Sequence, residues 1–162
     1  MADRDAENTL IVETTKGSAT IELRPDLAPN HVARVKELVR AGFYDGVPFH
    51  RVIDGFMAQT GDPTGRGNGG SGRNIDAEFS REPHMRGTVS MARAANPNSG
   101  DSQFFICFDE APWLDGQYTV WGRGTEGMEN IDRLKRGEPV LDPDAVTTIR
   151  VAADVASEIS AA

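Results

Sequence analysis

Polar and apolar residues alternate over two short stretches near the start of the chain. Residues 10–14 and 19–23 have the composition of β-strands, and Thr15, Lys16 and Gly17 join them. Glycine adopts a positive φ without steric cost, so Gly17 suits the tight turn of a hairpin. This pattern predicts an antiparallel pair of strands at the start of the fold.

Two further segments repeat apolar residues at the spacing of an α-helix. The apolar positions of the first are Val32, Val35, Leu38 and Val39. Those of the second are Met128, Ile131 and Leu134. Pro29 and Gly42 bound the first predicted helix, whereas Thr125 is expected to cap the second and Gly137 to end it. Each apolar stripe has to cover something, so both helices are expected to pack on other elements.

Short apolar runs bounded by glycine, proline and asparagine predict the remaining strands. The runs are residues 49–59, 88–91, 103–108 and, near the end, 149–155. Residues 61–73 are rich in glycine and poor in large side chains, which indicates a surface loop near the site. Many short strands with two isolated helices predict one mainly β domain over residues 1–162, an antiparallel barrel whose open ends the helices cap.

Composition and charge exclude several classes of function. The 162 residues carry a formal net charge of -8, which repels phosphate backbones and leaves no basic stripe for nucleic acid. Residues 1–8 have neither the basic start nor the apolar stretch of an export signal, so we expect a cytoplasmic protein without membrane contact. We expect a monomer because the predicted fold is a soluble closed barrel. The lone cysteine, Cys107, lies in an apolar run and is expected to be buried and unreactive.

Residues 49–61 carry the most specific chemistry. They set one arginine, Arg51, among apolar side chains, with the amide of Gln59 nearby. An arginine on a surface is usually only solvated, but apolar neighbours change its surroundings. This combination suits a neutral, apolar substrate that contains a peptide bond.

Two other short motifs contribute candidate binding residues. Period-two alternation puts Phe104 and Ile106 on the core side of a strand. Gln103 and Phe105 then face outward together, and Phe105 either lines a binding surface or packs beneath a loop or helix. Trp113, in a turn-like setting, either presents an apolar face or is a core tryptophan.

Other catalytic chemistries find little support. Residues 65–70 match the dinucleotide fingerprint GxGxxG, but no apolar helical stripe follows to receive a pyrophosphate. The histidines, His31, His50 and His84, lack metal-site spacing, and His50 is expected to point inward and satisfy a backbone group. The nucleophile elbow GxSxG is absent. We therefore expect neither a metal nor a cofactor.

Three motifs in this chain are residues 49–61, Ser102-Gln103-Phe104-Phe105-Ile106 and Trp113-Leu114-Asp115-Gly116. Together they resemble the active face of the cyclophilins, which are peptidyl-prolyl cis-trans isomerases. The resemblance runs from the first hairpin to the last strand. It implies a closed eight-stranded antiparallel barrel capped by two α-helices, with Arg51 as the catalytic arginine. The pocket residues that it implies are Phe56, Met57, Gln59, Ala92, Gln103, Phe105, Trp113 and Leu114.

The resemblance gives Arg51 a physical task. Rotation about a peptide bond has a barrier of about 18–20 kcal/mol because the nitrogen lone pair is delocalised. A cation that interacts with the prolyl nitrogen in the twisted transition state lowers that barrier, and a dry apolar hollow strengthens the interaction. Gln59 is expected to assist as a second catalytic residue, either by holding the guanidinium or by binding the substrate carbonyl.

The chain departs from the family pattern at a few positions. Tyr118 stands where many cyclophilins have a histidine, so a polar ring persists with a different donor geometry. We count Tyr118 among the substrate-binding residues, and the affinity for cyclosporin-type inhibitors stays open. Arg93 stands where asparagine is frequent, and the loop of residues 94–101 is one residue longer. These last two features resemble bacterial members.

The sequence therefore predicts an isomerase that interconverts cis and trans Xaa-Pro bonds in peptides and in folding proteins. The alternative is a non-catalytic module that holds proline-containing segments without turnover. The same apolar hollow serves both functions. Arg51 and Gln59 favour catalysis, because binding a proline ring needs no cation beneath its nitrogen.

Overall fold

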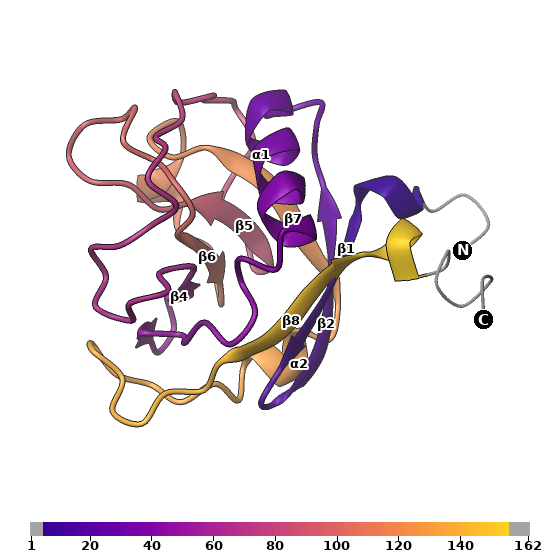
Figure 1. Ribbon diagram of the computed structural model, residues 1–162. Helices are drawn as coiled ribbons and strands as arrows, with labels where there is room; N and C mark the ends of the chain where they lie inside the picture. The colour runs from indigo at the N-terminus through magenta and orange to yellow at the C-terminus, as the bar shows by residue number, and fades with distance from the viewer. Residues whose placement is uncertain (1–4, 156–162) are drawn as a thin grey trace.

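The computed structural model describes residues 5–155, in which eight antiparallel strands form one strongly curled sheet (Figure 1). The strands are β1 (Thr9–Thr14), β2 (Gly17–Leu23), β3 (Arg51–Ile53), β4 (Met57–Thr60), β5 (Thr88–Met91), β6 (Phe104–Cys107), β7 (Val120–Glu126) and β8 (Val146–Val151). The helices are α1 (Pro29–Arg40), α2 (Met128–Ile131) and two 3-10 turns, η1 (Ala6–Asn8) and η2 (Pro112–Leu114). The predicted mainly β, antiparallel architecture is confirmed.

The expectation of a closed barrel is wrong. The strand order is β3-β4-β6-β5-β7-β2-β1-β8, so β3 and β8 are the two edges of the sheet. At the seam, residues 46–49, which precede β3, form backbone hydrogen bonds with residues 144–146 around an isolated bridge between Pro48 and Ala145. The free edge of β3 has another partner, because Val52 exchanges both backbone hydrogen bonds with Gly137 at 2.8 Å. Because this edge of β3 is hydrogen-bonded to Gly137 and not to β8, the sheet is an open half-barrel.

The first hairpin and the first helix are confirmed. Gly17 begins β2 with a φ of +122°, and the helix α1 buries Val32, Val35, Leu38 and Val39 as predicted. No local side chain caps this helix at Ala28. Instead the carboxylate of Glu78, from a distant loop, accepts hydrogen bonds from the backbone N–H groups of Asn30 and His31.

The second helix differs from the prediction. Thr125 does not cap it, because β7 continues through Thr125 and pairs with β2 as far as the partners Thr20 and Glu126. Gly127, with a φ of +81°, then turns the chain into the single turn α2. The helix ends at Ile131 and not at the predicted Gly137, so Leu134 lies beyond it. The apolar positions are nevertheless inward, since Ile131 and Leu134 are buried and Met128 is partly buried against the core.

Two predicted strands also have different bounds. Residues 49–59 form a hairpin rather than one strand, because Gly55 at a φ of +73° turns β3 into β4. The last strand ends at Val151, and residues 152–155 are helical. Val151 pairs with Leu10, which is the outermost partner of β8 in the adjacent strand β1. The apolar alternation beyond Val151 therefore has no neighbouring strand with which to pair.

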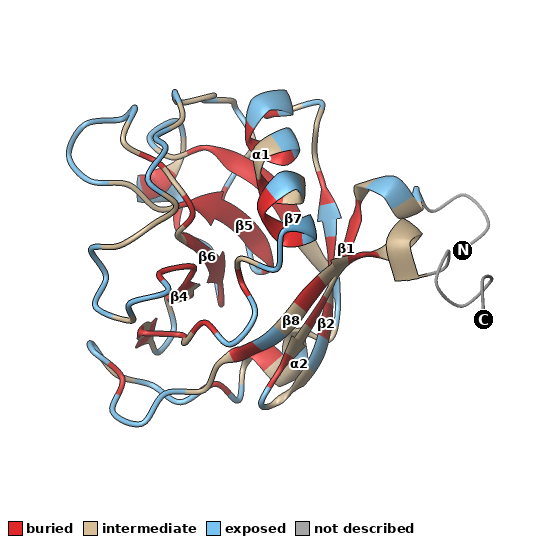
Figure 2. Ribbon diagram, in the orientation of Figure 1, coloured by how far each residue is buried: buried red, intermediate tan, exposed pale blue. Residues whose placement is uncertain are grey.

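The sheet buries apolar side chains on both of its faces. Figure 2 shows the inner strands β5 and β6 as buried, whereas the long loops are largely exposed. The main core surrounds the T-shaped contacts of Phe104 with Tyr44 and Trp121. A second, smaller cluster on the outer face consists of Met57, Phe105, Cys107, Ala111 and Leu114. This second cluster underlies the candidate site.

Two further observations concern the described residues. Cys107 is fully buried, as predicted, and burial raises the pKa of its thiol to about 12. Within residues 5–155, no helix has the length and apolar character needed to cross a bilayer.

Candidate active site

The strand register brings the predicted catalytic residues onto one face of the sheet. Arg51 in β3 lies opposite Gln59 in β4, and Gln59 lies opposite Phe105 in β6. Side chains of directly paired residues share a face, so this row projects to the outer side. Val52 and Ala58 alternate with them and face the main core.

This row borders a small apolar cavity of about 110 Å³. The residues that line it are Arg51, Phe56, Met57, Gln59, Ala92, Arg93, Phe105, Leu114 and Tyr118. Met57, Phe105 and Leu114 are buried members of the outer cluster. Phe105 has both of the environments that were considered for its outward side chain, packing against neighbouring rings and lining a cavity. It packs near the rings of His84 and Tyr118 and still contributes to the cavity wall.

Two side chains hold the guanidinium of Arg51. Its Nε donates to Oε2 of Glu138 at 2.8 Å, and its Nη1 donates to Oε1 of Gln59 at 3.3 Å. The arginine side chain is 39% exposed, so it lies at the mouth of the cavity rather than in bulk water. The hydrogen bond from Arg51 to Gln59 is the contact that one of the two roles expected for Gln59 requires, and that role stays a prediction.

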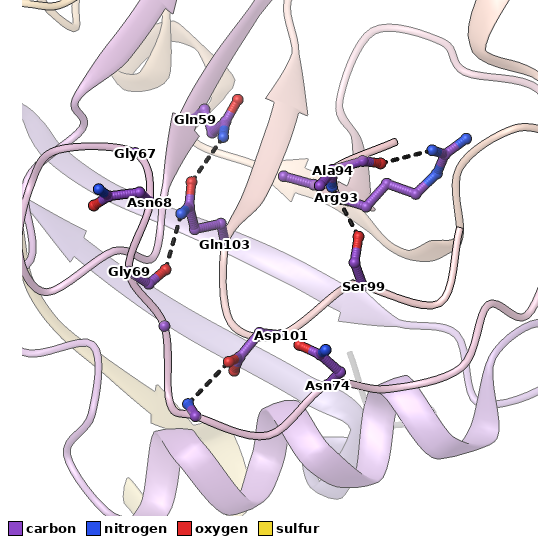
Figure 3. A pocket seen from close by; sticks show the side chains of 13 residues that line it. Gln59, Gly67, Asn68, Gly69, Asn74, Arg93, Ala94, Ser99, Asp101 and Gln103 are labelled. Atoms are coloured by element: carbon purple, nitrogen blue, oxygen red, sulfur yellow. Dashed lines mark hydrogen bonds between the residues drawn. The ribbon is translucent and has the colours of Figure 1, made fainter. Parts of the chain in front are cut away.

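The amide of Gln59 continues into a chain of hydrogen bonds (Figure 3). Its Nε2 donates to Oε1 of Gln103 at 2.9 Å, and Nε2 of Gln103 donates to the carbonyl of Gly69 at 2.9 Å. These bonds fix which end of each amide carries oxygen. The orientation of Arg51 is thus tied to the glycine-rich loop.

A larger cavity of about 580 Å³ adjoins the smaller one. The two cavities share Gln59, Ala92 and Arg93. Figure 3 shows Gln103 and Gly69 on one side of the larger cavity and Ser99 and Arg93 on the other. Such a pair of adjoining hollows can accept one residue of a peptide in the smaller and its neighbours in the larger.

The loop of residues 61–73 is organised around one carboxylate. Asp62 is fully buried and accepts hydrogen bonds from the backbone N–H groups of Thr64, Gly67 and Gly69, and from the Thr64 hydroxyl. Burial alone would raise the pKa of Asp62, but these donors outweigh burial and lower the pKa to about 2. The backbone N–H groups of this glycine-rich loop therefore bind the carboxylate of Asp62, which is an anion of the protein itself. No helix follows the loop within residues 71–87.

Trp113 is not a core tryptophan, since it is 64% exposed and Trp121 fills the core. Its ring contacts that of Phe56, with centroids 5.6 Å apart. Trp113 does not line either cavity itself. Trp113 contacts Phe56, and Phe56 lines the smaller cavity. The predicted role of Trp113 in binding stays a prediction.

His50 points inward as predicted and is 6% exposed. It does not satisfy a backbone group through Nδ1, which has no hydrogen-bond partner among residues 5–155. Across the same residues, no three histidine, cysteine or acidic side chains lie close enough to hold a metal ion.

Two contacts at the site carry no local signal in the sequence. Glu138 lies far along the chain, and the backbone hydrogen bonds of Val52 with Gly137 and of His50 with Val140 bring it beside Arg51. Arg93 stood out only as a departure from the family pattern, yet it lines both cavities. Periodicity does not reveal such contacts, because it reports on nearby positions and these contacts join residues that are far apart in the sequence.

Comparison with known proteins agrees with this geometry. Residues 9–153 match the family model described as cyclophilin type peptidyl-prolyl cis-trans isomerase/CLD. A probable peptidyl-prolyl cis-trans isomerase of Brucella suis is 50% identical over 167 residues, which cover 93% of this chain and 85% of the relative. A peptidyl-prolyl cis-trans isomerase of Synechococcus elongatus is 45% identical, over 85% of this chain and 95% of the relative.

Solved structures give the same result. A crystal structure of a cyclophilin from Hirschia baltica has a TM-score of 0.86 at 35% identity, covering 93% of this chain and 76% of that one. A cyclophilin-type isomerase of Cryptosporidium parvum, crystallised in the presence of the dipeptide Ala-Pro, has a TM-score of 0.83 at 31% identity, covering 88% of this chain and 98% of that one. The chain therefore belongs to the cyclophilin-type peptidyl-prolyl cis-trans isomerases and is an enzyme of that class.

Proposed function

We propose that the smaller cavity receives the proline ring of the substrate and that Arg51 stabilises the twisted peptide bond. The observation that carries this assignment is the position of the guanidinium, hydrogen-bonded to Gln59 at the mouth of an apolar cavity. The Ala-Pro dipeptide present with the Cryptosporidium relative supports proline-containing peptides as the ligand class.

The chemistry needs neither a nucleophile nor a proton transfer. Nη2 of Arg51 makes no hydrogen bond with any of residues 5–155, so it is available to a substrate. As the bond twists, the prolyl nitrogen becomes pyramidal and gains a lone pair that can accept from this donor. The donor interacts more strongly with that lone pair than with the planar amide, so it lowers the barrier selectively.

The apolar floor supplies the second part of the effect. Met57, Phe105 and Leu114 exclude water beside the guanidinium, which strengthens its interaction with the nitrogen. Phe56, Ala92 and Tyr118 complete the wall, with Trp113 against Phe56. A reduction of about 7 kcal/mol would bring exchange from tens of seconds to about a millisecond.

The wider setting belongs to the same proposal. We infer a single-domain, cytoplasmic monomer that acts on folding proteins as well as on short peptides. A protein that holds proline segments without turnover is the weaker reading, because the relatives that match over most of the chain are named isomerases. We retain cyclosporin-type inhibitors only as candidate ligands.

Replacement of Arg51 tests the assignment directly. In an isomerisation assay on a short Xaa-Pro peptide, Arg51→Ala should lower kcat/KM about 100-fold, as for other single donors to a transition state. Arg136→Ala is the matched control, because Arg136 bonds Asp54 and the carbonyl of Asp132, just after α2, outside both cavities. Nearly full activity in a folded Arg51→Ala protein would refute the role of Arg51.

A further inference from the structure

Arg93 is the least explained residue of the wall between the two cavities. Three residues line both hollows, and Gln59 already belongs to the chain of amides that orients Arg51. Ala92 offers only a methyl group. Arg93 is half-buried and places a long side chain along the same wall.

The guanidinium of Arg93 joins two separate loops. Its Nε and Nη2 donate to the carbonyl of Gln117 at 3.0 and 2.7 Å. Its Nη1 donates to the carbonyls of Ala94 and Ala95 at 2.9 and 3.3 Å, the first of which is drawn in Figure 3. All four bonds end on backbone oxygens, so the side chain fastens the loop after β5 to the turn after η2.

The same guanidinium covers the ring of Tyr118. The central carbon of the guanidinium lies 4.5 Å from the ring centroid, at the distance of a cation–π contact. Tyr118 in turn meets Phe105 edge to face, with centroids 5.8 Å apart. A continuous contact therefore runs from the wall at Arg93 to the floor of the smaller cavity at Phe105.

The chemistry of arginine suits both contacts of Arg93. A guanidinium can stack on an aromatic face and donate to carbonyls in its own plane at the same time. Arg93 does both, toward the ring of Tyr118 and toward the carbonyl of Gln117.

We propose that Arg93 and Tyr118 act as one positioning unit that holds the wall and floor of the proline cavity, so that loss of either has the effect of losing both. The inference rests on the proposed function, in which that cavity receives proline. A loosened cavity has to be ordered when the peptide binds, in the ground state as in the transition state. The cost therefore falls on KM and leaves kcat almost unchanged.

A double-mutant cycle tests the proposal. Arg93→Met keeps the apolar stem and removes the guanidinium, and Tyr118→Leu removes the ring. On a short Xaa-Pro peptide, each single change should raise KM about 3- to 5-fold with kcat within about 2-fold, and the double change should match the worse single one. Two effects on KM that multiply in the double variant would overturn the proposal, as would a loss confined to kcat.

Arg86→Met is the matched control. Arg86 likewise bonds a backbone carbonyl, that of Phe108, and it pairs with Asp132, but it lines neither cavity. This control should lower the melting temperature and leave KM unchanged. A rise in KM equal to that of Arg93→Met would show that general destabilisation explains both.

Two further arms keep the test decisive. If Arg93→Met does not fold, Arg93→Lys replaces it, since lysine keeps a charge near the ring but cannot bond the Gln117 carbonyl with two donors. The same non-additivity with Tyr118→Leu is expected. Full activity of Arg51→Ala would defeat the proposed function, whereas an inactive Arg51→Ala with an additive cycle would defeat this inference alone.

Discussion

At the scale of single residues, the orientation of Arg51 depends on two side chains from different parts of the chain. Gln59 is its neighbour across the β3–β4 hairpin, and Glu138 comes from the segment that follows α2. A long arginine side chain samples many rotamers unless such partners hold it. Both partners leave Nη2 free, so they hold the group without occupying its donor toward substrate.

Removing the carboxylate partner should therefore reduce turnover. Glu138→Ala is expected to lower kcat about 2- to 5-fold, a size that suits one exposed ion pair. Glu138→Gln, which keeps an oxygen for Nε of Arg51, should lose less. Asp54→Ala removes the carboxylate that pairs with Arg136 and is the control. Steady-state kinetics in which Glu138→Ala equals the unmodified protein would contradict the prediction.

Trp113 provides a different test at the same scale. Its exposed ring rests on Phe56 outside the cavity, so we expect it to add contact area for a bound peptide without touching the reacting bond. Trp113→Ala should weaken peptide binding, measured by calorimetry, more than it lowers kcat. Equal losses in binding and turnover would assign it a part in the chemistry instead.

At the scale of elements, a loop without regular structure supports the amide chain. Asp62 accepts from the N–H of Gly69, and the carbonyl of Gly69 accepts from Gln103. Gln103 accepts from Gln59, which accepts from Arg51. A buried carboxylate is thus connected through the loop to the guanidinium of Arg51, and the glycines allow the backbone N–H groups to converge on that carboxylate.

The stability of this loop should depend on pH through Asp62. A folded pKa of about 2 against an ordinary 3.8 corresponds to about 2 kcal/mol at neutral pH. Because the folded pKa is lowered, this contribution is present above pH 3.8 and is lost as the pH falls toward 2. Urea unfolding should show Asp62→Asn to be less stable by about that amount at pH 7, with a difference that shrinks below pH 4. A difference that is constant from pH 7 to pH 2 would contradict the assignment.

At the scale of the whole molecule, three buried histidines connect distant parts of the fold. His31 contacts Glu78, which caps α1, and His84 bonds Asp115 beside η2. His50 lies beneath the glycine-rich loop, near Gly67. Burial lowers the pKa of all three, and for His31 and His84 it outweighs the neighbouring carboxylates. The native state therefore favours neutral histidines.

The whole protein should consequently lose stability in mild acid while its chemistry stays unaffected. The unfolded chain binds protons near pH 6.5 and the folded chain only at lower pH, so the free energy of unfolding should fall as the pH drops below 6.5. None of the three histidines lines either cavity, so kcat/KM should change little between pH 6 and 8. A bell-shaped rate profile, or constant stability down to pH 5, would contradict this account.

Local patterns in the sequence determined much of this protein. The alternation in β1 and β2 and the apolar stripe of α1 predicted elements that the structure confirms. These features follow from side-chain periodicity and turn residues, which act over a few positions. The motif chemistry around Arg51 likewise pointed to the face on which Gln59 and Phe105 gather.

Only the tertiary structure decided how these pieces meet. It started α2 only after Gly127, since pairing with β2 retained Thr125 in β7, and it left the barrel open because Gly137 occupies the edge of β3. It also brought Glu138 to Arg51 and the carbonyl of Gln117 to Arg93. Such contacts depend on the three-dimensional path of the backbone. No periodic signal encodes them, because the local sequence around each of these polar groups is equally compatible with exposure to solvent.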